Sequence, residues 1–223
     1  MFTNRQGTGD LALDEDHNRS FAVDGRWGIS EAGQLAGFAA RTFTPNLDRN
    51  EHAVKIGGTL NTQALRLDSS YMQVGEGFNP EMGFLRRQNF RKMNFSIFNF
   101  YRPQDVMGLL EIRPHASYQS FWNFDGLQKT GRLHAGSHWE WRNSWGAETG
   151  MNLTKEAVLT PFEIFPGVVV PAGNYHDAEA RWIINSDMAA WLSLRLTLTH
   201  GGFFGGNRVG TLTQLKFRLR ETF

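Results

Sequence analysis

The chain has 223 residues, 40% of them hydrophobic, with 23 Lys and Arg against 22 Asp and Glu and no Cys. This length can bury a core, but the formal net charge of +1 leaves no basic surplus to neutralise phosphates, which excludes nucleic acid as the main partner. The lack of cysteine excludes a disulfide scaffold, thiolate zinc sites and thiol catalysis.

No helical membrane span or leader is visible in the sequence. The longest uncharged stretches reach about a dozen residues, short of the roughly 18–20 that a spanning helix needs. The opening Met1–Arg5 lacks the basic and apolar regions of a signal peptide. Hydropathy alone would therefore class the chain as a soluble protein.

The first half of the chain alternates apolar and polar residues with the period of two that is typical of strands. Within residues 20–29, for example, Val23 and Trp27 alternate with Asp24 and Arg26. By this pattern, strands are predicted at residues 20–29, 34–44, 52–61, 64–74 and 92–102.

The second half continues the same pattern, which is clearest where Leu192 and Leu194 alternate with Ser193 and Arg195. Further strands are predicted at residues 107–121, 130–142, 145–154, 175–185, 190–200 and 208–220. Turn-forming residues separate them, and no amphipathic helix is evident, so the sequence predicts about eleven strands. We expect an all-β, antiparallel up-and-down meander.

Alternation is common to soluble sandwiches and transmembrane β-barrels, so other features are needed to choose between them. Many predicted strands run to about ten residues, as a tilted membrane strand requires. Their polar positions combine opposite charges, as at Asp24/Arg26, Arg66/Asp68 and Glu140/Arg142. Aromatic residues gather near strand ends, as girdles at membrane interfaces do: Trp27, Phe43, Tyr71, Tyr101, Phe121, Trp122, Trp139, Trp141, Tyr175, Trp182 and Trp191. These features favour a transmembrane barrel, and a soluble sandwich or barrel stays open as the alternative.

Residues 74–87 and 161–175 carry a family resemblance. The first includes Phe78, Asn79, Pro80, Glu81, Gly83, Phe84, Arg86 and Arg87, and the second Pro166, Gly167, Pro171, Gly173 and Tyr175. Both resemble the C-terminal outer-membrane β-barrel domain, of unknown function, in bacterial proteins with an N-terminal family-9-like carbohydrate-binding module. The opening Phe2–Gln6 also resembles an internal strand end of that domain, and the similarity covers nearly all of the chain.

The resemblance implies a place in the outer membrane of a Gram-negative-type bacterium. It implies outer-membrane lipid, carbohydrate and the barrel-assembly machinery as partners. Members of the family carry a signal peptide, a carbohydrate-binding module and early barrel strands that this chain lacks, and they continue past the equivalent of Phe223. Because single-chain bacterial barrels have an even number of strands, about eleven fits an incomplete barrel. We therefore expect residues 1–223 to form a single β-barrel segment truncated at both ends.

The sequence predicts no catalytic residue, metal site or cofactor. His134 and His138 share a strand face but lie roughly 13 Å apart along it, too far to bind one metal ion directly. The patterns HExxH, GxSxG and the P-loop are absent, and the acidic segment Asp10–Asp16 lacks EF-hand spacing and is interpreted as a solvated extracellular loop. Some family members are labelled hydrolases because of the N-terminal module, so we expect no enzyme activity in this chain.

Two segments between the predicted strands are interpreted as a turn and a loop. Asn79–Glu81 is interpreted as a rigid turn fixed by Pro80 in preference to a loop folded into the lumen as a plug. Residues 160–174 are interpreted as a loop that packs on the barrel mouth or the membrane interface.

The leading hypothesis for the function is passage or docking of an oligosaccharide or other solute at the cell surface. The alternatives are a soluble all-β carbohydrate-binding or hydrolase accessory domain, and a structural membrane anchor.

Overall fold

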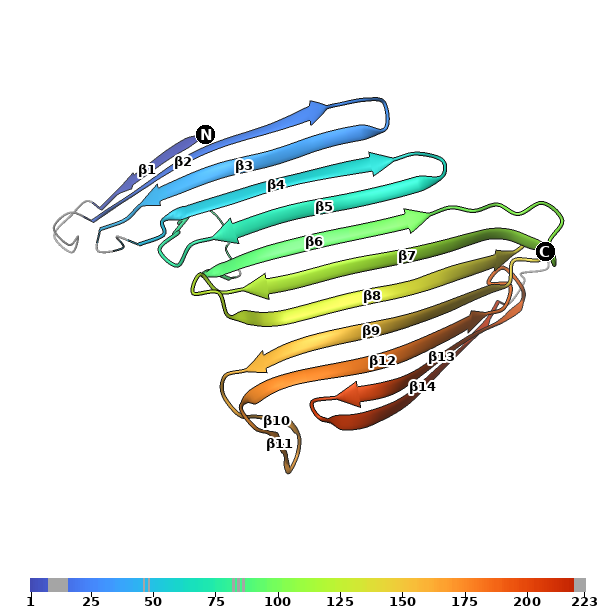
Figure 1. Ribbon diagram of the computed structural model, residues 1–223. Helices are drawn as coiled ribbons and strands as arrows, with labels where there is room; N and C mark the ends of the chain where they lie inside the picture. Colours follow the sequence, from blue (N-terminus) through green and yellow to red (C-terminus); the bar gives the residue numbers. More distant parts are fainter. Residues whose placement is uncertain are drawn as a thin grey trace. The chain divides into compact units, whose positions relative to one another are not determined.

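A computed structural model describes residues 1–7, 16–45, 47, 49–81, 83, 85 and 87–218. Twelve strands form one antiparallel sheet in the order β1-β2-β3-β4-β5-β6-β7-β8-β9-β12-β13-β14, and β10 and β11 form a separate two-stranded sheet (Figure 1). The bounds are β1 Phe2–Gln6, β2 His17–Gly28, β3 Gly33–Phe43, β4 His52–Asn61, β5 Leu65–Val74, β6 Phe90–Asn99, β7 Leu109–Trp122, β8 Gln128–Trp141, β9 Gly146–Val158, β10 Phe162–Phe165, β11 Val168–Val170, β12 Gly173–Asn185, β13 Leu192–Phe203 and β14 Gly206–Phe217.

The prediction of an all-β antiparallel meander is confirmed, and each predicted strand overlaps one strand of the sheet. The sheet has twelve strands where alternation predicts about eleven, and the additional strand is β1, which was expected only from the resemblance of Phe2–Gln6 to a strand end. Its five residues are too few to show alternation, yet they pair with β2 from Phe2 opposite Phe21 to Gln6 opposite His17. The strand order is open, since β1 and β14 each pair with one neighbour only.

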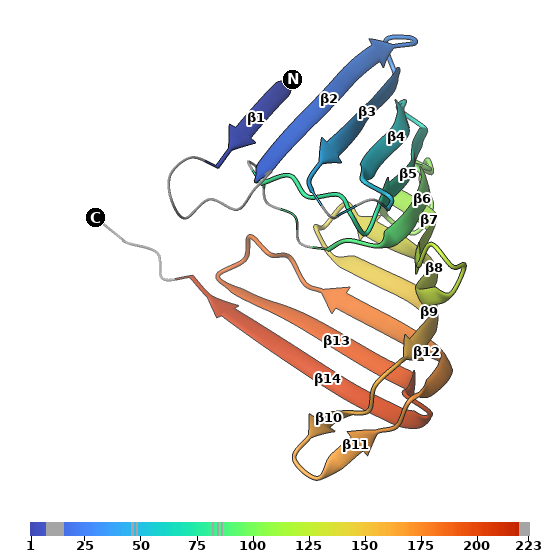
Figure 2. The same ribbon diagram turned by 90° about the vertical axis from the view of Figure 1, so that its left-hand side faces the viewer.

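Within the segment 160–174, which was predicted as a loop, Phe162–Val170 forms a β-hairpin, and Gly173 and Asn174 belong to β12. Phe162–Phe165 pairs with Val168–Val170 around the turn at Pro166-Gly167 (Figure 2). Gly167 has φ 81, a conformation that glycine adopts without strain. The β-branched run from Val168 to Val170 favours a strand, but it is only three residues long, which hid it from a search for alternation.

The chain divides into two compact units, which are described separately. Unit 1 comprises Met1–Asn61, Leu67–Phe95 and Gln119–Lys129. In β3 and β4, Ala40 lies opposite Ala53, and Phe38 lies opposite Lys55, so these side chains share one face of the sheet. On this face a small core forms, in which Ala53, Val74, Phe78 and Phe90 are buried and Phe38, Ala40, Met72, Leu85 and Phe121 pack around them.

Unit 2 comprises Thr62–Arg66, Ser96–Tyr118 and Thr130–Phe223. Its strand register sorts side chains into cross-strand rows, because directly opposite residues point to the same side of a sheet. One row runs Trp139, Ala147, Ile184, Leu196, Thr213, and it belongs to what we call the apolar face. Another row runs His134, Asn152, Glu179, Gly201, Arg208, and it belongs to the polar face.

The two faces of unit 2 differ sharply in chemistry across β8, β9, β12, β13 and β14. Between Leu133 and Trp141, every second residue of β8 belongs to the apolar face, and so do Leu192, Leu194, Leu196 and Leu198 of β13. The polar face carries the charged residues of the strand centres, together with a few apolar ones such as the buried Ile183. Within the part of the chain that the structure describes, no helix has the length and apolar character needed to cross a membrane.

Candidate functional site on the polar face of unit 2

A chain of polar contacts crosses the polar face of unit 2 from β7 to β14. It consists of His115, His134, Asn152, Glu179 and Arg208, and we call it the polar ladder. The register places His134 opposite Asn152, and Asn152 opposite Glu179, so consecutive members lie within reach of one another. Glu179 and Arg208 belong to strands on either side of β13, and both lie opposite Gly201.

The distances show a continuous series of hydrogen bonds. Nε2 of His115 lies 2.9 Å from Nε2 of His134, and Nδ1 of His134 lies 2.7 Å from Oδ1 of Asn152. The Asn152 amide nitrogen donates to Oε1 of Glu179 at 3.1 Å, and the other carboxylate oxygen pairs with Arg208. Because Asn152 presents its oxygen to His134, Nδ1 of His134 is the donor in that contact.

Glycines make room for the ladder. A Cβ on Gly150 would lie 2.7 Å from Cε1 of His134, so glycine lets the imidazole lie against the β9 backbone. A Cβ on Gly201 would lie 2.3 Å from the Ala178 carbonyl oxygen. With no side chain at Gly201, Arg208 reaches across β13 to the Glu179 carboxylate.

Three histidine rings gather at the β7 end of the ladder. The His115 ring lies 5.0 Å from that of His134 and 4.7 Å from that of His138, measured between centroids, and Phe98 stacks on it at 4.7 Å. The sequence predicts that His134 and His138 lie too far apart to bind one metal ion directly, but it does not predict that β7 brings His115 close to both. Among the described residues, no group of three or more His, Asp or Glu side chains is arranged to hold a metal ion.

Arginine–glutamate pairs occupy the polar face next to the ladder. Arg113 pairs with Glu140 at 3.3 Å and with Glu111 at 3.4 Å, and Arg195 pairs with Glu148 at 3.7 Å. The opposite charges noted in the sequence at Asp24/Arg26, Arg66/Asp68 and Glu140/Arg142 do not pair with each other within the described ranges. Glu140 instead pairs with Arg113 of the neighbouring strand β7.

Two hollows open on this polar face. One of about 220 Å³ is lined by Arg113, Glu140, Glu148 and Arg195 among others, so its charges neutralise one another. The other, of about 380 Å³, lies over β12, β13 and β14 and is lined by Glu179, Arg181, Thr197, Thr199, Arg208, Gly210, Thr211 and Leu212. The second hollow differs because one of its arginines, Arg181, lacks a carboxylate partner among the described residues.

Phe78, Leu85 and Arg87 of the first signature block lie at the small core of unit 1. Phe78 is buried among Ala53, Val74 and Phe90, and Gln88 donates its side-chain amide to the Phe78 carbonyl at 2.7 Å. Arg87 lies over the Phe121 ring at 5.1 Å. Phe84 and Arg86 lie outside the described residues, as does most of the acidic segment Asp10–Asp16.

Asn79 joins this block to the sheet through two polar contacts. Its backbone N–H donates to Oγ1 of Thr42 at 3.0 Å, and its carbonyl accepts from Nδ2 of Asn18 at 2.8 Å. A turn follows, in which Gly83 donates to the Pro80 carbonyl at 2.8 Å. A rigid turn fixed by Pro80 is therefore only part of the structure here. The Phe78 ring packs in the core, and the Asn79 backbone binds Thr42 and Asn18 of the sheet.

Ion pairs connect the same block to the N-terminal part of the chain. The Arg5 guanidinium contacts Oδ1 of Asp16 at 2.8 Å and also pairs with Glu81. The hydrogen bond from Arg5 holds the pKa of the Asp16 carboxyl below its usual range. Asp16 thus keeps its charge, and its hold on Arg5, in moderately acidic solution.

The second signature block lies at the β10–β11 hairpin. The Tyr175 hydroxyl donates to the Pro171 carbonyl at 2.8 Å, and Gly173 lies beside the Tyr175 ring. Tyr175 and Phe162 both meet the Phe204 ring edge-on at 5.5 Å, so these aromatics join the hairpin to the β13–β14 turn. The hairpin residue Phe165 is 70% exposed, and Pro166 and Gly167 form its turn.

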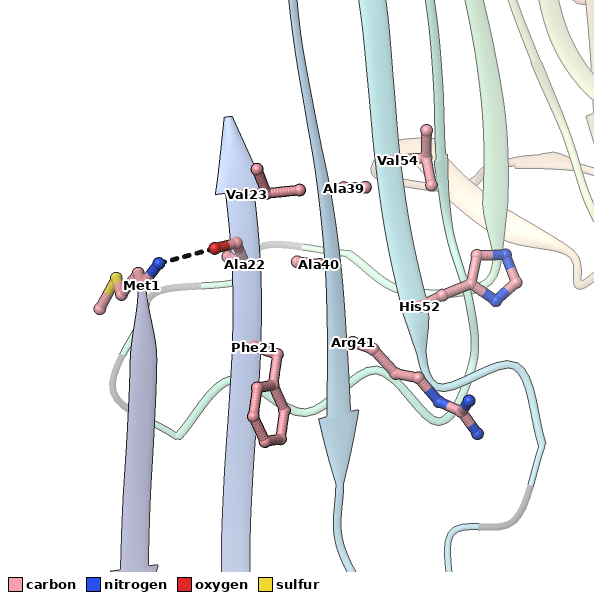
Figure 3. A pocket seen from close by; sticks show the side chains of 9 residues that line it. All are labelled: Met1, Phe21, Ala22, Val23, Ala39, Ala40, Arg41, His52 and Val54. Atoms are coloured by element: carbon pink, nitrogen blue, oxygen red, sulfur yellow. Dashed lines mark hydrogen bonds between the residues drawn. The ribbon is translucent and has the colours of Figure 1, made fainter. Parts of the chain in front are cut away.

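A shallow groove of about 430 Å³ lies on the opposite, apolar face of unit 1 (Figure 3). Phe21 and Val23 border it on β2, and Val54 and His52 border it on β4, with the small Ala39 of β3 as its floor. The Met1 amino group donates to the Ala22 carbonyl at 2.7 Å, which holds the start of the chain beside the groove. Small side chains between large ones, not a set of polar groups, create this hollow.

No protein-family model, curated protein or solved structure matches the chain. The geometry of the two faces is therefore the basis for the functional argument.

Proposed function

We propose that the chain forms part of a transmembrane β-barrel in the outer membrane of a Gram-negative-type bacterium. Its apolar face meets lipid, and its polar face lines a water-filled lumen. In that lumen an oligosaccharide or another polar solute passes or docks. The separation of charged from apolar side chains onto opposite faces of long strands carries this proposal.

The strongest support comes from the centres of the unit 2 strands. The row Trp139, Ala147, Ile184, Leu196, Thr213 has no charge, and neither has the next row, Ser137, Thr149, Trp182, Leu198, Thr211. An arginine on a lipid-facing position at mid-bilayer costs roughly 2–4 kcal/mol. On the other face, His134, Glu148, Glu179, Arg181 and Arg195 would be wetted by the lumen.

Strand length and the positions of aromatic residues agree with a membrane environment. Strands β2–β9 and β12–β14 have 10 to 14 residues, which suits a tilted span of a hydrocarbon layer about 30 Å thick. Trp27 and Trp191 are each 66% exposed near strand ends, where an interfacial girdle would place them. An exposed tryptophan is costly in water and favourable at a membrane interface.

The proposal requires further strands to pair with β1 and β14. In a bilayer, unpaired strand edges cost several kcal/mol for each unsatisfied backbone group, so a sheet must close on itself. Those strands would come from a longer chain or from another copy. Closure would also put the polar faces on the inside, which is where a lumen needs them.

Partitioning tests the proposal. We expect the expressed chain to aggregate in buffer and to give a folded β spectrum by circular dichroism only in detergent micelles or lipid vesicles. A monodisperse folded species in buffer without detergent would overturn the proposal and support the alternative of a soluble all-β carbohydrate-binding or hydrolase accessory domain. Conductance across planar bilayers then separates a pore from an anchor, since an anchor gives a β spectrum in vesicles but no ion flux.

A further inference from the structure

We propose that the hollow over β12, β13 and β14 binds a carboxylate or sulfate group carried by an oligosaccharide, with Arg181 as its principal ligand. The nature of the solute rests on the proposed function, but the anion site itself is argued from contacts in unit 2. The hollow has a volume of about 380 Å³, on the scale of a sugar ring rather than of a single ion.

Arg181 is placed at the hollow by the register of four strands. It lies opposite Gly150 of β9 and Thr199 of β13, and Thr199 lies opposite Gly210 of β14. Two of these neighbours have no side chain, and the third is short. The guanidinium group is therefore exposed on the polar face and is not covered by its cross-strand neighbours.

Among the arginines on the polar face of β7, β8, β12, β13 and β14, Arg181 is the one with no ion-pair or hydrogen-bond partner in the described residues. Arg132 has no carboxylate partner either, but it donates to Oδ1 of Asn152 at 2.9 Å. Arg113 and Arg195 pair with glutamates, and Arg208 pairs with Glu179. Among the described residues, Arg181 has no ion pair, hydrogen bond or ring contact. The carboxylate nearest to it along β12, Glu179, is already engaged by Arg208 and Asn152.

The other side chains around the hollow suit an anionic sugar. A guanidinium presents parallel N–H groups that match the two oxygens of a carboxylate or sulfate. The hydroxyl groups of Thr197 and Thr199 add neutral hydrogen-bond partners beside it. Leu212 is 58% exposed beside these polar groups, and it offers an apolar surface to the C–H groups of a sugar ring. A free inorganic anion would make no use of Leu212.

The test measures binding to the full chain in detergent micelles by isothermal titration calorimetry. The probes are trigalacturonate, which carries carboxylates, the neutral maltotriose, and inorganic sulfate. We expect trigalacturonate to bind and maltotriose not to bind. Arg181→Gln should weaken trigalacturonate binding at least about tenfold, as the loss of a charge-assisted hydrogen bond predicts, and Thr199→Val should weaken it about fivefold.

Arg26→Gln is the matched control. Arg26 is also exposed, also lacks an ion pair among the described residues, and loses the same charge, but it belongs to unit 1 and does not line the hollow. We expect it to leave trigalacturonate affinity unchanged. Circular dichroism of each variant verifies that it folds.

The outcomes separate this inference from the proposed function. Equal binding by wild type and Arg181→Gln overturns the inference, as does an equal loss in Arg26→Gln or tight binding of maltotriose. Binding of sulfate without trigalacturonate also overturns it, because the site would then hold a free anion. If planar bilayers show no conductance but binding depends on Arg181, the lumen proposal loses its pore and the anion site stands.

Discussion

Unit 1 and unit 2 each have one face that makes many contacts, and the two faces differ in chemistry. In unit 1, the face that bears Ala40 and Ala53 is covered by Phe78 and its neighbours, which form a small apolar core. In unit 2, the polar face bears histidines, glutamates and arginines that contact one another in rows. One face is sealed by a folded segment of the chain, whereas the other is left open to solvent.

This difference shows how one repeating pattern of strands supports two roles. The buried Phe78 ring needs small and apolar neighbours, which Ala40, Ala53 and Val74 supply. A polar network needs short cross-strand distances, which Gly150 and Gly201 allow. The predictions below would break one of these arrangements and leave the other in place.

The largest effect on stability is expected in the small core of unit 1. Phe78→Ala removes a buried ring, 7% exposed, and should lower the free energy of unfolding by about 3–5 kcal/mol. It should also make residues 75–88 sensitive to limited proteolysis. Urea titration of the refolded protein, followed by tryptophan fluorescence, measures the first effect, and mass spectrometry of the fragments measures the second.

Phe165→Ala is the control for that substitution. Phe165 is 70% exposed at the β10–β11 hairpin, so its truncation should change the unfolding free energy by less than about 0.5 kcal/mol. Equal effects of the two substitutions would contradict the core described for unit 1.

An intermediate effect is expected in the polar ladder. In Gly201→Ala, the new Cβ would lie 2.3 Å from the Ala178 carbonyl oxygen, which forces β12 and β13 apart. We expect a loss of about 1–3 kcal/mol in unfolding free energy, the usual cost of overpacking. Gly25→Ala is the matched control, because a Cβ there meets nothing within 4 Å. Urea titration should separate the two variants, and indistinguishable midpoints would mean that β12 and β13 do not approach so closely.

The smallest effect concerns the ion pair that closes the unit 1 segment. Because Arg5 lowers the pKa of Asp16 in the folded state, the resulting stability is fully present above the unfolded pKa of about 3.9. It is lost as the pH falls through the lower folded pKa. We therefore expect Asp16→Asn to lower the urea midpoint slightly at pH 7, with the difference from wild type shrinking steadily as the pH falls below about 3.9. A difference that stays constant as the pH is lowered through this range would show that the charge of Asp16 is not the cause.

The alternation of single residues was enough to predict the meander, since Leu192–Leu198 and Val23–Trp27 show their faces without any partner. It could not reveal β1 or the β10–β11 hairpin, because strands of three to five residues are too short to establish a period. Strand existence was therefore more predictable than strand number.

The candidate site was less predictable, because it depends on register. His134 and His138 were visible in one strand, but the contact of His134 with His115 depends on how β7 aligns with β8. The pairing of Glu140 with Arg113 arises in the same way. The missing partner of Arg181 could be recognised only after Gly150 and Thr199 were known to lie opposite it. A possible signal in the sequence was the set of glycines inside these strands, which mark close approaches of neighbouring groups.

The most direct test of the account is a scan of spin labels along β13. The chain has no cysteine, so single cysteines at positions 194 to 199 can be labelled without any background in protein refolded into lipid vesicles. Electron paramagnetic resonance then measures collisions with oxygen, which dissolves in lipid, and with a nickel chelate, which stays in water. If the apolar face meets lipid, labels at 194, 196 and 198 will collide mainly with oxygen, and labels at 195, 197 and 199 mainly with the chelate. Exposure of 194, 196 and 198 to the chelate, or shielding of these positions from both reagents, would contradict a lipid-facing surface.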